Sequence, residues 1–331
     1  MNQLAAVELR SLAHQQLGVP ADPGWSLNPS TAQLGRDRWF VASHHGHHGF
    51  VLDEDLSVLH TADFTPPPRE PGDYRPQATA AASPDGRTIA HLCWPTLDIE
   101  RIDGDSFSVD VGQGDDSGGS QIAFTRDSAS CLFVSPPPGD PDDDYLLRRL
   151  DLVTGRLDVL GALDAFGFFG VRLENGDRHV LINIDQGQNG SALYRHSLED
   201  GGTTVESGVV FDDISADGTW IMGADDEAVH VSEWPGRTTV GRVRSADLTI
   251  AADGGFGHGY LEAMAIGARH LLVWSRPASP VALLLEREPL RAVGRLEFPD
   301  GDHRPVAYRR NRLLTTTDSA VTVFALDSLP I

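Results

Sequence analysis

A short pattern recurs along the whole chain: small or apolar residues, a tight polar turn, and then a run of apolar and β-branched residues. Its clearest copies are residues 81–90, with the turn Ser83-Pro84-Asp85-Gly86, and residues 213–222, with the turn Ala216-Asp217-Gly218. Asp-Gly supplies the backbone conformation of a tight turn between two strands. A chain of such copies is expected to stack one supersecondary unit many times over.

The spacing of the turns predicts the architecture. Seven turns can be placed along the sequence, at Asp37, Asp85, Asp127, Asn175, Asp217, Ala268 and Asn311. The intervals are 48, 42, 48, 42, 51 and 43 residues, and blades of four-stranded propellers repeat about every 40–50 residues. Each copy also holds a second hairpin, clearest in residues 145–160. We therefore predict an all-β fold, a seven-bladed β-propeller of four-stranded antiparallel blades.

Two details of this architecture stay open in the sequence. Asp253-Gly254 is an alternative turn for the sixth copy, and a six-bladed arrangement is the alternative to seven. Residues 320–326 end the last copy without a fourth strand, so a segment near residues 7–12 is expected to complete the last blade and to protect its edge. We expect residues 1–23 to be an N-terminal extension, either helical or a closing strand, and residues 24–331 to form one propeller domain.

The turn Ser83-Pro84-Asp85-Gly86 and the hairpin residues 150–156, Leu-Asp-Leu-Val-Thr-Gly-Arg, resemble those of the WD40-like, TolB-type β-propeller repeat proteins. The resemblance extends over nearly the whole chain, and it is carried by short structural motifs. It implies the fold and transfers no functional residue.

The charge of the chain disfavours several classes of function. There are 48 acidic and 26 basic residues, a formal net charge of −22, and every basic residue is arginine. Such a charge repels nucleic acid and anionic membranes, and the absence of lysine excludes a Schiff-base lysine and a P-loop lysine. No membrane-spanning apolar run and no signal-peptide pattern is present, so we expect a cytoplasmic protein.

A histidine-rich segment, residues 43–49, is a candidate metal site. Imidazoles and carboxylates together bind divalent ions, and the candidate ligands are His44, His45, His47 and His48 with Asp185 or Asp213. His258 or His303 would then act as general acid or base. This arrangement predicts one divalent metal ion and a metal-assisted hydrolase or lyase at the mouth of the central channel. The structural interpretation is an exposed hairpin with alternating histidines.

Acidic residues are expected to gather at one end of the blades. In the predicted register, Asp142, Asp143, Asp144, Asp225 and Asp226 all follow second strands. A concentration of negative charge steers positively charged partners toward a surface. Glycine-flanked aromatic residues in predicted loops are further contact candidates, namely Phe168, Phe169, Phe256 and Tyr260. The alternative is that they pack between blades.

One further carboxylate pair differs from the repeat. Asp212 and Asp213 fall on a predicted first strand where the other copies carry apolar or small residues, so they are either hydrogen-bonded within the fold or part of a ligand site.

The sequence contains no Gly-x-Ser-x-Gly elbow, His-Glu-x-x-His helix, P-loop or Rossmann fingerprint. The leading hypothesis is therefore a non-enzymatic protein-binding scaffold that needs no cofactor. Its expected partner is a protein or basic peptide, with a cationic small molecule as a further possibility and neither nucleic acid nor membrane as a partner. The metal-assisted hydrolase or lyase is the alternative.

Overall fold

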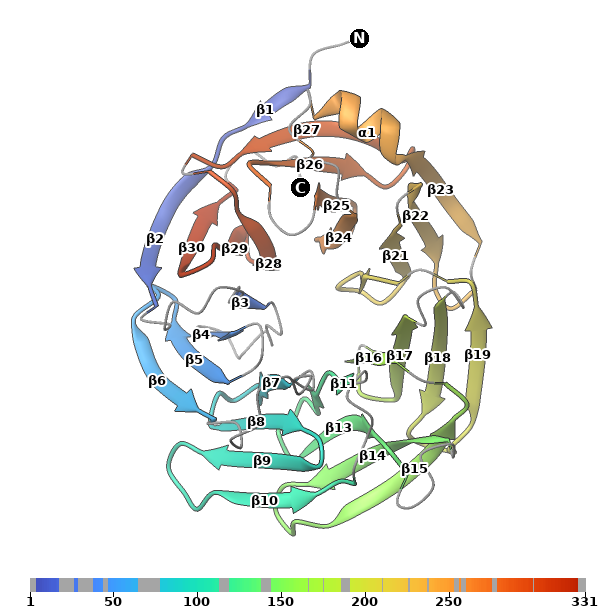
Figure 1. Ribbon diagram of the computed structural model, residues 1–331. Helices are drawn as coiled ribbons and strands as arrows, with labels where there is room; N and C mark the ends of the chain where they lie inside the picture. Colours follow the sequence, from blue (N-terminus) through green and yellow to red (C-terminus); the bar gives the residue numbers. More distant parts are fainter. Residues whose placement is uncertain are drawn as a thin grey trace, which may run out of the picture. The chain divides into compact units, whose positions relative to one another are not determined.

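The structure is a seven-bladed β-propeller: all-β, with seven sheets that each contain a four-stranded antiparallel meander (Figure 1). It is a computed structural model that describes residues 4–17, 27–28, 38–43, 47–64, 78–112, 119–137, 144–165, 167–174, 176–185, 191–209, 211–225, 227–236, 238–252, 256, 260–275, 279–299 and 301–326. The chain divides into two compact units, residues 18–208 and a terminal unit of residues 1–17 and 209–331.

Residues 18–208 form four blades. Their strands are β3 (Leu27–Asn28), β4 (Arg38–Ser43), β5 (His48–Asp53) and β6 (Val58–Asp63); β7 (Thr79–Ala82), β8 (Thr88–Cys93), β9 (Thr96–Arg101) and β10 (Phe107–Asp110); β12 (Ala123–Phe124), β13 (Ser130–Ser135), β14 (Tyr145–Asp151) and β15 (Leu157–Leu163); and β16 (Phe168–Leu173), β17 (His179–Asp185), β18 (Ser191–Ser197) and β19 (Thr203–Ser207). A two-residue strand, β11 (Gly119–Ser120), pairs in parallel with β16.

The terminal unit forms three blades. Their strands are β20 (Asp213–Ile214), β21 (Trp220–Ala224), β22 (Ala228–Glu233) and β23 (Thr239–Arg244); β24 (Leu261–Ile266), β25 (His270–Ser275), β26 (Val281–Glu286) and β27 (Arg291–Glu297); and β28 (Arg304–Arg309), β29 (Arg312–Thr316), β30 (Ala320–Ala325) and β2 (Arg10–Gln16). A short helix, α1 (Ser245–Ala251), lies between β23 and β24 in the sequence, and β1 (Ala5–Val7) pairs in parallel with β27.

Five of the seven predicted turns, at residues 85, 127, 217, 268 and 311, lie between the first and second strands of a blade, so the predicted register is confirmed there. Asp37 and Asn175 lie outside the described residues. The alternative register at Asp253-Gly254 is wrong, because the first turn of the sixth blade is residues 267–269, between β24 and β25. The six-bladed alternative is also wrong, because the strands form seven separate sheets.

The recurring turns are held by one set of side-chain hydrogen bonds. In blades two, three and five a hydroxyl donates to the carboxylate two residues later, over 2.6, 2.7 and 2.6 Å, in the pairs Ser83–Asp85, Thr125–Asp127 and Ser215–Asp217. The same carboxylates accept a backbone N–H from the residue two positions beyond them. Gly86 and Gly218 follow with φ of 67° and 70°, a conformation that glycine adopts without steric cost.

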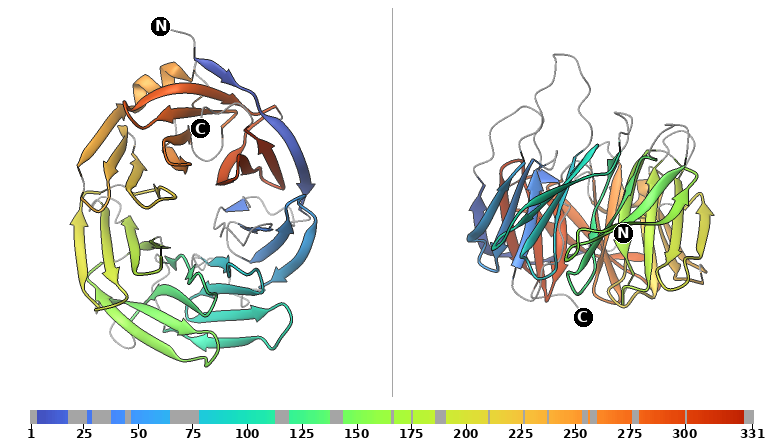
Figure 2. Two further views of the ribbon diagram at one scale, coloured as in Figure 1. Left: turned by 180° about the vertical axis from the view of Figure 1, so that it is seen from behind. Right: turned by 90° about the horizontal axis from the view of Figure 1, so that it is seen from below.

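The N-terminal segment completes the last blade, as predicted, although its closing strand begins later than residue 7. β2 pairs antiparallel with β30 over Arg10–Gln16, so the segment is a strand and not a helix. Just before it, β1 adds a fifth strand to the neighbouring blade, and both views of the terminal unit show the segment running along β27 and then β30 (Figures 1 and 2). Val7 and Leu17 are buried at its two ends.

Deletion of residues 1–17 is therefore expected to destabilise the protein strongly. The deletion exposes the edges of β27 and β30 and removes the buried side chains Val7 and Leu17, each worth about 1.5–3 kcal/mol. We expect thermal unfolding to begin about 5 °C lower or more, while deletion of residues 1–3 changes little. Equal melting temperatures for the two truncations, measured by circular dichroism, would show that the strand does not hold the terminal unit together.

Candidate functional site

The two ends of the blades differ in charge. Because the strands of a blade are antiparallel, its connections alternate between two ends. We call the end that carries the first-to-second and third-to-fourth connections the turn end, and the opposite end, with the second-to-third connections and the crossings to the next blade, the acidic end. Counted along the sequence within the two units, and including residues outside the described part, the acidic end has 17 acidic residues and three arginines, and the turn end has 13 and nine.

The predicted acidic residues are only partly described. Asp144 is exposed directly before β14, whereas Asp142, Asp143 and Asp226 lie outside the described residues. Asp225 has a structural role, because its Oδ1 accepts the backbone N–H groups of residues 227 and 228 over 2.8 and 2.7 Å, and its Oδ2 lies 3.1 Å from Nε2 of His230. Its neighbour Glu227 is exposed and pairs with Arg242 at 2.8 Å.

The aromatic candidates divide between core and surface. Phe168 and Phe169 begin β16, so their predicted place in a loop is wrong. Phe169 is fully buried and lies 5.1 Å from Tyr145, ring centroid to ring centroid, and Phe256 is 4 % exposed in the core of the terminal unit. These two rings pack between strands. Phe168 is half-buried, and Tyr260 is 66 % exposed directly before β24.

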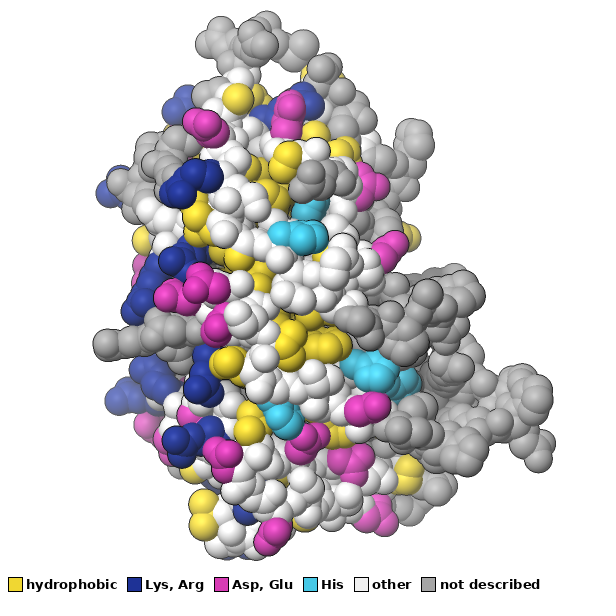
Figure 3. Space-filling model, turned by 90° about the vertical axis from the view of Figure 1, so that its left-hand side faces the viewer, with side chains coloured by type: hydrophobic (Ala, Val, Ile, Leu, Met, Phe, Trp, Pro, Cys, Tyr) yellow, Lys and Arg dark blue, Asp and Glu magenta, His cyan; other side chains and the backbone are white. Residues whose placement is uncertain are grey.

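The histidine candidates do not form one described cluster. His44, His45 and His258 lie outside the described residues, as does the side chain of Asp185. His47 is buried, and Nδ1 of His48 lies 3.4 Å from Asp63. Across the part of the chain that the structure describes, no group of three or more His, Cys, Asp or Glu side chains is arranged to hold a metal ion. Histidine side chains are drawn in cyan in Figure 3, which shows one face of the molecule. The divalent ion stays a prediction.

His303, the other candidate acid or base, is embedded in the terminal unit. It is 1 % exposed, its Nδ1 lies 2.8 Å from the hydroxyl of Thr315, and its ring packs between Phe298 and Phe324. Asp213 is similarly engaged, because its Oδ2 accepts the backbone N–H of Ala265 at 3.0 Å. Both contacts are those of residues that hold strands together.

No pattern in the sequence predicted the histidine pair at the junction of blades one and two. The ring of His91, on β8, lies 6.0 Å from that of His47, and Phe64 stacks on it at 4.4 Å. Its Nδ1 is 3.6 Å from Asp98, and this contact lowers the pKa of Asp98. Nearby His60 lies 2.6 Å from Glu100. A single histidine within a strand has no pattern to distinguish it, so only the packing of the two blades could identify this junction.

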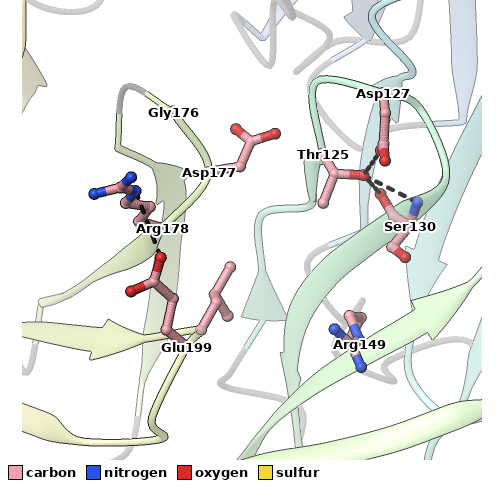
Figure 4. A pocket seen from close by; sticks show the side chains of 9 residues that line it. Thr125, Asp127, Ser130, Arg149, Gly176, Asp177, Arg178 and Glu199 are labelled. Atoms are coloured by element: carbon pink, nitrogen blue, oxygen red, sulfur yellow. Dashed lines mark hydrogen bonds and ion pairs between the residues drawn. The ribbon is translucent and has the colours of Figure 1, made fainter.

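A polar cleft opens between blades three and four, at the turn end. Its volume is about 450 Å³, and Figure 4 shows its side chains on the facing turns and strands of the two blades. The lining residues are Thr125, Asp127, Ser130, Arg149, Gly176, Asp177, Arg178, Leu198 and Glu199. Ionisable side chains of both signs therefore face one cavity.

The cleft lies where the fourth blade departs from the repeated turn. Residues 174–178, Glu-Asn-Gly-Asp-Arg, lack the hydroxyl residue found in the turns of blades two, three and five. Asp177 has φ 55°, and its Oδ2 accepts the backbone N–H of Arg126 from the neighbouring blade at 2.5 Å. On the other side, hydrogen bonds from the Thr125 hydroxyl and the backbone N–H of Ala129 lower the pKa of Asp127. Both carboxylates are fixed in place.

Comparison with known proteins identifies the fold alone. No protein-family model matches the chain, and no curated protein matches it. Among 863 matching chains of solved structures is Kuenenia stuttgartiensis hydrazine synthase, at 12 % sequence identity and a TM-score of 0.59, covering 93 % of this chain and 98 % of that chain. A match at such low identity confirms the fold-level resemblance to β-propellers and carries no function. No helix among the described residues is long and apolar enough to cross a membrane.

Asp212 offers a test of whether the unusual carboxylates of blade five are structural. Its Oδ2 accepts the backbone N–H groups of Ala224 and Ala263, each at 3.0 Å, so it links β21 to β24. Removing it leaves two partly buried N–H groups without this acceptor. We expect Asp212→Ala to lower the free energy of unfolding in urea by about 2 kcal/mol or more, and exposed Asp55→Ala to change it far less. Two equal, small effects would favour a ligand-binding role for Asp212.

A buried histidine predicts a specific pH dependence. His196 is 2 % exposed, lies 2.8 Å from the Thr203 hydroxyl, and has its pKa lowered by burial. The folded state thus favours neutral imidazole, so this contribution to stability is present above the unfolded pKa of about 6.5 and is lost as the pH falls through the folded pKa. Urea denaturation at about pH 7.5 and about pH 5.5 should show a smaller difference in stability for His196→Gln than for the wild type. If the variant and the wild type showed the same difference in stability between the two pH values, the prediction would be wrong.

Proposed function

We propose that this protein is a non-enzymatic scaffold that binds a basic protein or peptide through the acidic end of its blades. The observation that supports this is the unequal charge of the two ends: 17 acidic residues against three arginines at one, 13 against nine at the other. Because the two ends hold similar proportions of acidic residues, the difference in charge comes from the arginines. The excess of acidic over basic residues is concentrated in the connections between strands, and these can vary without changing the core of a propeller.

Electrostatic attraction is the physical basis of this proposal. Charges separated by less than about 10 Å interact at physiological ionic strength, and a concentration of one sign raises the rate at which a partner of opposite sign arrives. Steering gives rate and orientation more than affinity. Affinity then needs partly exposed apolar contacts, and Tyr260, 66 % exposed in a connection of the acidic end, is one available anchor.

The segment that should contribute most is residues 140–144, Asp-Pro-Asp-Asp-Asp, because it has four acids and no basic residue. Asp144, its described residue, is exposed. By contrast, Asp225 is engaged in its own turn, and Glu227 already pairs with Arg242. We expect residues 142–144 to affect binding more than residues 225–227.

The test compares two triple variants of equal charge. Asp142→Asn, Asp143→Asn and Asp144→Asn remove three charges at the acidic end, and Asp55→Asn, Asp103→Asn and Asp105→Asn remove three exposed charges at the turn end. Fluorescence anisotropy with a labelled nona-arginine peptide measures affinity at several salt concentrations. We expect the first variant to bind about five- to tenfold more weakly at low salt, with a shallower salt dependence, and the second to change less than about twofold.

Equal losses in the two variants would contradict the proposal, because they would mean that the probe responds to net charge alone. Affinity purification with the same three proteins as bait extends the test to natural partners. A stoichiometric, basic partner should be retained by the wild type and the turn-end variant and lost by the acidic-end variant. A partner retained by all three would place the binding surface elsewhere.

A further inference from the structure

The cleft between blades three and four has the features of a binding site for a small molecule with charges of both signs. Its volume of about 450 Å³ is enough for a small molecule, and the cleft is open and mainly polar. Of its lining side chains five are ionisable and one, Leu198, is apolar, and no aromatic ring lines it. The cleft therefore has no surface complementary to a large apolar or aromatic ligand, and its side chains are complementary to a polar, charged one.

Two carboxylates on facing turns supply the negative side. The pKa of Asp127 is lowered by the hydrogen bonds that it accepts, so it is ionised at neutral pH, and Oδ1 is the oxygen that accepts them. Asp177 uses Oδ2 for the N–H of Arg126. In Figure 4 these carboxylates lie on either side of the gap. Each carboxylate has a second oxygen, and each carboxylate oxygen can accept more than one hydrogen bond. An ammonium group between the two turns can therefore donate hydrogen bonds to carboxylates of both blades.

Two arginines supply the positive side, and their ion pairs are long. Nη2 of Arg149 lies 3.3 Å from Asp158, an acid that also pairs with Arg156 at 2.9 Å. Nε of Arg178 lies 3.5 Å from Glu199, and both of these side chains are largely exposed. Exposed ion pairs of this kind contribute little, so exchanging one for a ligand carboxylate costs little, and an arginine can bind a carboxylate through two parallel hydrogen bonds.

We propose that this cleft binds a small zwitterion, a free amino acid or short peptide, with its ammonium group at Asp127 and Asp177 and its carboxylate at Arg149. A purely anionic ligand would meet Asp127, Asp177 and Glu199, and a purely cationic one would meet both arginines. A ligand with one positive and one negative group can pair with both the carboxylates and the arginines. The site is at the turn end, so it is independent of the partner binding proposed for the acidic end.

Isothermal titration calorimetry with the full-length protein and alanyl-alanine tests this proposal, with free alanine as a second ligand to distinguish peptide from amino acid. We expect saturable binding with a Kd of about 1 mM or tighter for at least one of them. Asp177→Asn, which keeps an acceptor for Arg126, and Arg149→Gln should each weaken it at least about fivefold. The matched variants Asp103→Asn and Arg87→Gln, at exposed positions outside the cleft, should not.

Blocked ligands separate zwitterion recognition from general charge. N-acetyl-alanyl-alanine and alanyl-alanine amide should each bind at least about fivefold more weakly than the ligand with both ends free. Melting temperatures of all four variants establish that each is folded. The proposal is overturned if neither zwitterion binds saturably, if the blocked ligands bind equally well, or if the cleft and control variants behave alike.

Discussion

The hydrogen bond from a turn hydroxyl to the aspartate two residues later is the local interaction on which blades two, three and five depend. It fixes the geometry of the first turn in blades two, three and five, and turn geometry sets the register of the strands on either side. The turns also connect neighbouring blades: the N–H of Asp85 donates to the Ser128 hydroxyl, and that of Arg126 to Asp177. One polar motif thus specifies both the hairpin and the position of the next blade.

Because of this role, acidic residues at the turn end and at the acidic end need different explanations. At the turn end Asp85, Asp127 and Asp217 are needed for the fold, so their number says nothing about partners. At the acidic end the connections have no common turn motif, and Asp225 is a described acid there with a clear structural role. The two ends hold similar proportions of acidic residues, so the acidic end is distinguished by its few arginines, three against nine. The proposed attraction of a basic partner is consistent with this difference and with the charge of the whole chain.

The sequence predicted what the repeat controls. Turns recur because each blade needs one, so seven turns gave seven blades, and the missing fourth strand of the last blade pointed to the N-terminus. It did not predict the parallel strands β1 and β11 or helix α1, since each occurs once. Phe169 and Phe256 were predicted to lie in loops because glycines flank them and no strand pattern surrounds them, but tertiary packing buries both side chains. The His47–His91 contact and the cleft arise between blades, where spacing along the chain carries no information.

Departures from the repeat separate into two kinds when their contacts are compared. Asp212 and Asp213 replace the small or apolar residues of other first strands, and backbone N–H groups of β21 and β24 occupy the oxygens concerned, so the fold itself accounts for them. The turn of blade four also departs, and Asp177 is accounted for in the same way. Arg149 and Arg178 are not, because their ion pairs are long and, for Arg149, shared. A residue that the fold does not require, facing a cavity with others of complementary charge, is where ligand recognition is best sought.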